Sequence, residues 1–170
     1  MSEFERIVDA TRLPAGPQLF EASPEECAAL ARRFALVAVH NLSAAVTLAA
    51  DGPVVRVTGT VKADAVQSCA VSGDELPVQI AEPVALRFVP HYAAAPGADE
   101  VELSAEELDE IEMDGTRFDL GEALAQTMAL GIDPYAEGPG ADEARHKAGL
   151  LAAEQAGPLA AALRDLLKKT

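Results

Sequence analysis

Residues 54–67 read VVRVTGTVKADAVQ, and apolar and polar side chains alternate along them. The odd positions carry Val55, Val57, Gly59, Val61, Ala63 and Ala65. The even positions include Arg56, Thr58, Thr60, Lys62 and Asp64. A period of two is typical of a strand with one buried face. The stretch therefore predicts a half-buried antiparallel strand.

The same period continues on both sides of this stretch. Residues 36–49 place leucine, valine, alanine and His40 on their even positions, and Asp51-Gly52-Pro53 ends that run. Residues 76–90 predict one or two further strands, and shorter strands are expected at residues 4–9, 99–103 and 111–117. Successive strands joined by tight turns favour an antiparallel sheet. We expect an α+β fold: an antiparallel β-sheet or partly open small β-barrel with packed helices and a C-terminal helical tail.

Two helix starts are marked by capping residues. Ser23-Pro24-Glu25-Glu26 predicts a helix that runs to about Phe34, with Ser23 and Glu26 as a capping box. Asp119-Leu120-Gly121-Glu122 predicts a second helix, which ends near Gly131. Pro134 prevents the helix from continuing beyond that point. In this second start Asp119 and Glu122 cap the helix, Leu120 anchors it, and Gly121 allows a neighbouring element to approach closely.

The charge of the chain is concentrated in one stretch. Residues 99–143 carry 15 Asp and Glu and one basic residue, Arg117, which accounts for −14 of the net −15. A field of that sign repels phosphate backbones and favours basic partners. A solvated face that keeps the protein dissolved is the alternative interpretation, and both remain open. We divide the chain into a body, residues 1–136, which includes acidic segment 99–136, and a linker with a helical tail, residues 137–170.

Targeting and disulfide signals are weak. The first ten residues are charged, and no stretch approaches the roughly 20 apolar residues that span a bilayer. Cys27 and Cys69 are too few for a disulfide framework. We therefore expect a cytoplasmic protein with no membrane partner.

Three segments resemble the YceD family, the large ribosomal RNA subunit accumulation proteins. They are residues 57–61 with 69–77, residues 109–135 around FDLGE and Asp133-Pro134-Tyr135, and the C-terminal residues 157–168. Together they cover about residues 54–169, and the N-terminal third matches more loosely. The resemblance implies a non-catalytic role in large-subunit ribosome assembly. Ser72 departs from it, because many relatives have a second cysteine there, which places any shared metal or redox role in doubt.

Candidate sites follow from these patterns. We predict no catalytic residue, no cofactor and no metal site: the chain has no C-x-x-C or H-x-x-x-H spacing, and a calcium loop from Glu110 would end on Gly121. Cys69 continues the inward register of residues 54–67 and is expected to be a buried structural thiol. The hypothesised contacts to a basic ribosomal or assembly protein are Glu106, Glu107, Asp109, Glu110, Glu112 and Tyr135.

Two alternatives to protein docking are kept. One is weak RNA binding through Arg56, Lys62 and Arg87, although three charges are few for phosphate neutralisation and no interleaved aromatic side chains accompany them. The other is a thiol-dependent sensor or enzyme at Cys69, which would require an exposed and activated sulfur. If ribosomal RNA is a partner, we expect its contact to be indirect.

Overall fold

The computed structural model describes residues 3–91 and 110–149. These residues form seven strands and three helices, and the fold class is α+β, as predicted. Contacts group them into two compact units. The first lies within Met1–Gln67 and Pro77–Asp133, and the second within Ser68–Leu76 and Pro134–Thr170. The loop 68–76, which the sequence placed in the body, thus groups with the residues that follow Pro134.

The main sheet has five strands in the order β2-β3-β4-β5-β6. They are β2 (Pro17–Glu21), β3 (Ala38–Asp51), β4 (Val54–Ser68), β5 (Glu75–Pro90) and β6 (Glu110–Met113). Pairing is antiparallel between β2 and β3 and between β3 and β4. The described strands form an open sheet and not a closed barrel.

The expected all-antiparallel pairing is wrong at β6, which runs parallel to β5 with Arg87 opposite Glu110. Nineteen residues, 91–109, connect these two strands. A parallel pair needs a crossover of about a dozen residues or more, whereas a tight hairpin can only join antiparallel strands. The long connection therefore permits a pairing that alternation within a strand does not reveal.

The register of β4 is as predicted. Its odd positions from Val55 to Gln67 are buried apart from half-buried Gly59, and its even positions face solvent or are half-buried. In β3 the expected register fails at one place, because a β-bulge lies between Val39 and Asn41. The bulge shifts the register of the residues before it relative to those after it, so the predicted even register holds from Leu42 to Leu48 and fails at Val39. His40 is consequently exposed and Val39 is buried, the opposite of the expectation for a strand without a bulge.

Helix α1 (Pro24–Arg33) begins with the predicted capping box, in which Ser23 accepts from the Glu26 N–H and the Glu26 carboxylate accepts from the Ser23 N–H. Glu26 also binds the Arg6 guanidinium through both oxygens, at 2.7 and 2.9 Å. This interaction lowers the pKa of the Glu26 carboxyl. Strand β2, just before α1, was not predicted. It starts at Pro17 and lies at the end of the strand order, where a proline removes no ladder bond.

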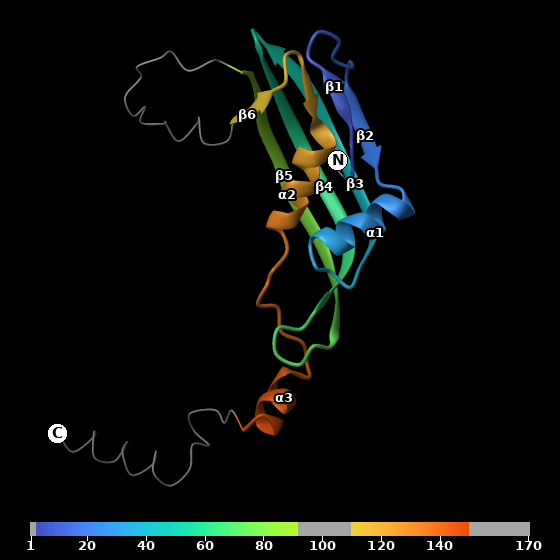
Figure 1. Cartoon of the computed structure of the whole chain (residues 1–170), viewed down its shortest axis with the longest axis vertical. Coiled ribbons are helices and arrows are strands. Elements are labelled where there is room, and N and C mark those ends of the chain that lie inside the picture. Colours follow the sequence, from blue (N-terminus) through green and yellow to red (C-terminus); the bar gives the residue numbers. More distant parts are fainter. Residues whose placement is uncertain (1–2, 92–109, 150–170) are drawn as a thin grey trace, which may run out of the picture. The chain divides into compact units, whose positions relative to one another are not determined.

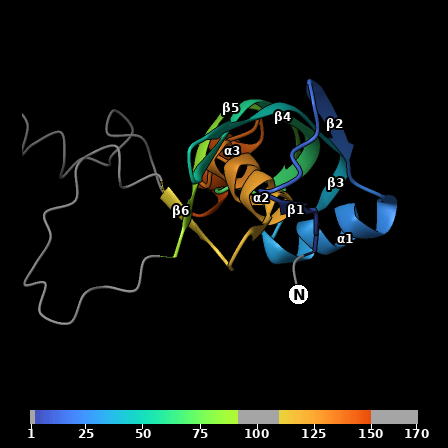
Figure 2. The same cartoon turned by 90° about the horizontal axis from the view of Figure 1, so that it is seen from above.

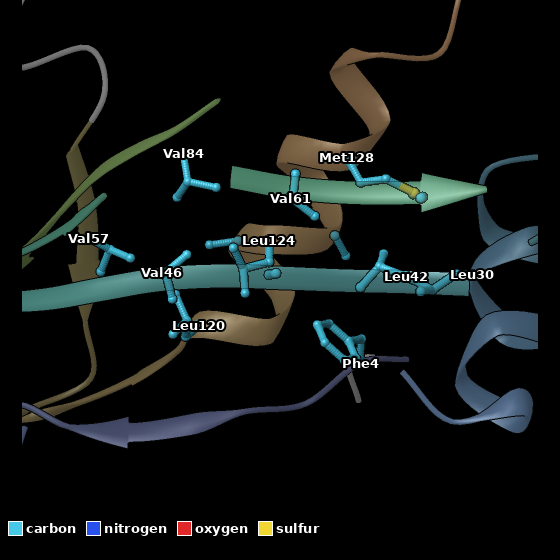
Figure 3. Close-up of a cluster of buried hydrophobic side chains, with 14 of the residues drawn as sticks. Phe4, Leu30, Leu42, Val46, Val57, Val61, Val84, Leu120, Leu124 and Met128 are labelled. Carbon is cyan, nitrogen blue, oxygen red and sulfur yellow. The ribbon is translucent and has the colours of Figure 1, made fainter. Parts of the chain in front are cut away.

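Helix α2 (Leu120–Leu130) lies across the concave face of β3, β4 and β5, and α1 lies beside β3 (Figures 1 and 2). The core between them contains aliphatic side chains from both helices and the long strands, and Phe4 closes it near the chain start (Figure 3). One stripe of α2 at helical spacing is buried: Leu120, Ala123, Leu124, Thr127 and Met128. The Phe88 and Phe118 rings stack on each other, with their centroids 4.0 Å apart.

A two-stranded ribbon joins the chain start to the region before α2. Strand β1 (Ile7–Asp9) pairs antiparallel with β7 (Arg117–Asp119). Just before β1, the Phe4 backbone passes over the first turn of α2 at Gly121. A Cβ added at Gly121 would lie 1.8 Å from the Phe4 carbonyl oxygen. The predicted need for a small residue at this position is confirmed.

The second unit contains the loop between β4 and β5, residues from Pro134 onward, and the short helix α3 (Ala141–Lys147). The Ala70 N–H donates to the Ala136 carbonyl at 2.9 Å, so the two segments are joined by backbone hydrogen bonding. Of the predicted linker and helical tail, residues 150–170 lie outside the described residues.

We predict that Gly121→Ala destabilises the protein by about 1–3 kcal/mol, since the new methyl group meets backbone and not a flexible side chain. On an ordinary helix the same change would stabilise by up to about 1 kcal/mol, so the expected sign is opposite to helix propensity. Urea unfolding followed by circular dichroism measures it. Gln126→Ala, at an exposed site on the same helix, is the control and should stay within about 0.5 kcal/mol.

Candidate functional site

The first unit has an open acidic hollow of about 540 Å³ where the ribbon β1–β7 meets β6. Four carboxylates and one guanidinium line it together with two apolar side chains: Glu5, Ile7, Glu112, Asp114, Arg117, Phe118 and Asp119. The Asp114 and Arg117 backbones exchange two hydrogen bonds, 2.9 and 3.0 Å long, around the tight turn at Gly115 and Thr116. This turn holds β6 and β7 together, so the carboxylates before and after it line one hollow.

The carboxylates of the hollow differ in their partners. Asp119 Oδ1 accepts from the backbone N–H groups of Arg6, at 2.9 Å, and Glu122, at 3.2 Å. Glu112 Oε2 lies 2.7 Å from His91 Nδ1, and both side chains are about two-thirds exposed. Within the described residues, the Glu5 and Asp114 carboxylates have no ion-pair partner. Asp119 therefore stabilises the start of α2 and the neighbouring Arg6 backbone. The carboxylates of Glu5, Glu112 and Asp114 are exposed to solvent.

The hypothesised docking residues are distributed unevenly. The structure brings Glu110 and Glu112 together on β6, where Glu110 pairs with Arg87 at 3.2 Å. Tyr135 is 81% exposed and belongs to the second unit. Glu106, Glu107 and Asp109 lie outside the described residues.

Sequence reasoning missed Glu5 as a member of the acidic surface. It lies more than a hundred residues before Glu112, in a part of the chain with balanced charge. Only the pairing of Ile7 with Asp119 brings it to the hollow. The signal that could have found it was the predicted strand at residues 4–9, but sequence alone did not identify its pairing partner.

The motif at the start of α2 has the predicted capping function and one addition. Asp119 caps the helix, Leu120 is fully buried, and α2 ends at Leu130 with Gly131 as its C-cap; Pro134 follows in a turn. The Glu122 carboxylate binds Arg33 of α1 through both oxygens, and Arg33 also reaches Glu3 at 2.8 Å. Glu122 thus links the two helices as well as taking part in the cap.

The proposed basic strand face is not assembled into a cluster of free cations. Arg56 pairs with Asp51 at 2.8 Å, and Arg87 pairs with Glu110 on the neighbouring strand. Lys62 is exposed on β4, and the described residues place no carboxylate in ion-pair distance of it. Each paired arginine would have to share its guanidinium with a carboxylate, or leave that carboxylate, in order to bind a phosphate. This arrangement weakens the RNA-binding alternative.

Cys69 lies in the second unit and is buried, at 3% exposure, as its register predicted. Its sulfur accepts hydrogen bonds from the backbone N–H groups of Ser72 and Gly138, with N···S distances of 3.3 and 3.4 Å. Donors around the sulfur, of which Ser72 is the strongest, lower the pKa of Cys69 to about 6. The Ser72 hydroxyl has one proton and also lies 2.7 Å from Asp74 Oδ2. The two backbone N–H groups therefore lower the pKa of Cys69 whichever acceptor the Ser72 hydroxyl donates to.

The lowered pKa of Cys69 was not predicted from the sequence. Thiolate character favours reaction, but burial keeps reagents and substrates from the sulfur. Both cysteines are free. Across residues 3–91 and 110–149, no three His, Cys, Asp or Glu side chains are placed to hold a metal ion. No helix in the described part is long and apolar enough to cross a membrane.

Comparisons with protein families, with curated proteins and with solved structures found no match.

We predict that Cys69 stabilises the protein in a pH-dependent way. Because its pKa is lowered by folding, its contribution is complete above the pKa of an unfolded thiol, about 8.5, and is lost as the pH falls through about 6. The difference in unfolding free energy between wild type and Cys69→Ala should therefore shrink between about pH 9 and pH 5. Denaturant titrations at several pH values measure it.

Cys27→Ala is the matched control. Burial raises the pKa of Cys27, so this thiol is neutral in both states below about pH 8 and its difference from wild type should not change there. If the difference in unfolding free energy between wild type and Cys69→Ala stays constant with pH, the Cys69 thiol is neutral in the folded protein and the prediction is wrong.

Proposed function

We propose that this protein is a non-catalytic, cytoplasmic factor of bacterial large-subunit ribosome assembly that docks a basic ribosomal or assembly protein through its acidic surface. Two features support the proposal. The first is the resemblance of residues 54–169 to the YceD family. The second is the acidic hollow, in which four carboxylates face one guanidinium.

The acidic hollow is the observation that carries the docking proposal. Its carboxylates come from two parts of the chain that are distant in sequence: Glu5 before β1, and residues 112–119 of β6, β7 and the turn between them. If these carboxylates only kept the surface solvated, they would not need to gather in one hollow. Within the described residues, Glu5 and Asp114 have no ion-pair partner and Glu112 contacts the exposed His91, so the three carboxylates can receive lysine or arginine side chains without first breaking an arginine pair.

Electrostatics define what kind of complex is expected. Concentrated charge of one sign raises the association rate with an oppositely charged partner and is screened by salt over roughly 8–10 Å at physiological ionic strength. The complex should therefore weaken steeply as salt is added. Ribosomal RNA would be contacted through the basic partner, since the acidic surface repels phosphates.

Deleting the acidic segment is not a clean test of docking. Residues 110–130 include β6, β7 and α2, so their removal would take away part of the core as well as the charge. Neutralising the solvent-facing carboxylates leaves those elements in place. Asp119 is excluded from the change because it caps α2.

We predict that the triple variant Glu5→Gln, Glu112→Gln, Asp114→Asn binds its basic partner about tenfold or more weakly at low salt. Three exposed charge pairs contribute about 0.2–1 kcal/mol each, and about 1.4 kcal/mol corresponds to a factor of ten. Affinity purification of the tagged protein from a bacterial lysate, with mass spectrometry and nuclease treatment, measures which ribosomal or assembly proteins are retained.

The matched control is Glu21→Gln, Asp64→Asn, Glu75→Gln, which removes the same charge from exposed residues that do not line the acidic hollow. Equal losses in both variants would indicate a net-charge effect and no defined surface. Retention of large-subunit RNA that depends on Arg56, Lys62 and Arg87, and not on the hollow, would instead favour the RNA-binding alternative.

A further inference from the structure

A second depression in the first unit has a different chemistry from the acidic hollow. It is a groove of about 300 Å³ between the C-terminal end of α2 and the strands β5 and β6. Five of its seven lining residues are apolar: Pro83, Ala85, Leu86, Ile111 and Leu130. Glu110 and Thr127 complete the lining. We call it the apolar groove.

Leu130 stands at the edge of the apolar groove with 81% of its surface exposed. A single exposed leucine needs no explanation on a protein surface. Here, however, it continues an apolar wall, because Leu86 and Ile111 opposite it are only half-buried. The rest of the described apolar surface is scattered: Leu19, at 66% exposure, lies on β2 at the other end of the strand order.

One carboxylate lies in the wall of the apolar groove, and others lie near it along the chain. Glu110 is part of its wall, and Glu112 follows two residues later on β6. The Glu82 side chain lies against Gly131, the residue after Leu130. Arg87 pairs with Glu110. Between residues 110 and 133 the chain carries six acidic residues and only Arg117 as a basic one.

We propose that the apolar groove receives an apolar side chain from a basic, amphipathic segment of the partner protein, while lysine and arginine residues of the same segment face these carboxylates. This inference rests on the proposed docking function and names the kind of segment that is bound. Charge complementarity selects it: an acidic amphipathic segment would meet like charge at the rim. Residues three or four positions apart on a helix lie on one face, so one segment can present both kinds of side chain.

The two surface features would then have separate effects on the complex. Carboxylates accelerate encounter and disfavour acidic partners, whereas a buried apolar anchor mainly slows dissociation. The apolar groove can seat one anchor and not an extended hydrophobic face, since about 300 Å³ is at the lower limit of known ligand pockets.

The test uses the full chain and a synthetic peptide of leucine and lysine, with leucine at every third or fourth position, labelled for fluorescence anisotropy. A second peptide has alanine in place of every leucine and the same charge. We expect the leucine peptide to bind about tenfold or more tightly than the alanine peptide, and Leu130→Ser to remove most of that advantage. The control Leu19→Ser, also at an exposed leucine, should change affinity by less than about twofold.

Backbone amide shifts in NMR spectra give a second measurement that does not depend on a variant. The leucine peptide should shift the resonances of Leu86, Ile111 and Thr127 more than the alanine peptide does. If both peptides bind equally well and Leu130→Ser has no effect, the apolar groove does not bind an apolar side chain of the partner and the inference is wrong. If the triple variant of the acidic hollow still weakens both peptides in that case, the proposed docking function stands without it.

Other occupants of the groove have distinct signatures, and each would overturn the inference. A loss of stability of about 2 kcal/mol or more in Leu130→Ser would show that the chain itself covers this leucine. A dimer in light scattering that dissociates in Leu130→Ser would show that a second copy covers it. Failure of both peptides and of the lysate purification, with no effect of the hollow variant, would remove the docking function together with the groove.

Discussion

The contact of the Phe4 backbone with Gly121 is the constraint on which the rest of the first unit depends. It brings the chain start over the first turn of α2, where Asp119 accepts both the Arg6 and the Glu122 N–H groups. From there β1 can pair with β7, and the Arg6 guanidinium can reach Glu26 at the start of α1. One close backbone approach thus joins the N-terminus to both helices and places Glu5 at the acidic hollow.

Patterns of neighbouring residues predicted those elements that are determined by the residues within or next to them. Alternation gave the face of β4, capping residues gave the starts of both helices, and a glycine inside a helix start indicated a close neighbour. Long-range choices were not predictable in the same way. The bulge at His40 reverses a register without changing composition, the parallel pairing of β6 depends on a nineteen-residue connection, and β2 has a short, proline-started sequence.

The candidate site shows the same division. Glu110 and Glu112 were found because they lie within the acidic run, and Glu5 was missed because only β1–β7 pairing brings it there. The lowered pKa of Cys69 could not be read from the sequence, because one of its hydrogen-bond donors, Gly138, lies sixty-nine residues away. The ion pairs of Arg56 and Arg87 likewise became visible only in three dimensions, and they alter the meaning of a basic strand face.

The pairing of Ile7 with Asp119 also has a consequence for the order of events during synthesis. A chain leaves the ribosome from its N-terminus, and β1 has no partner until more than a hundred further residues have emerged. Contacts of such large sequence separation form late and slowly. A nascent or truncated chain that lacks β7 therefore has no acidic hollow, and that surface can form only after residues 117–119 have been synthesised.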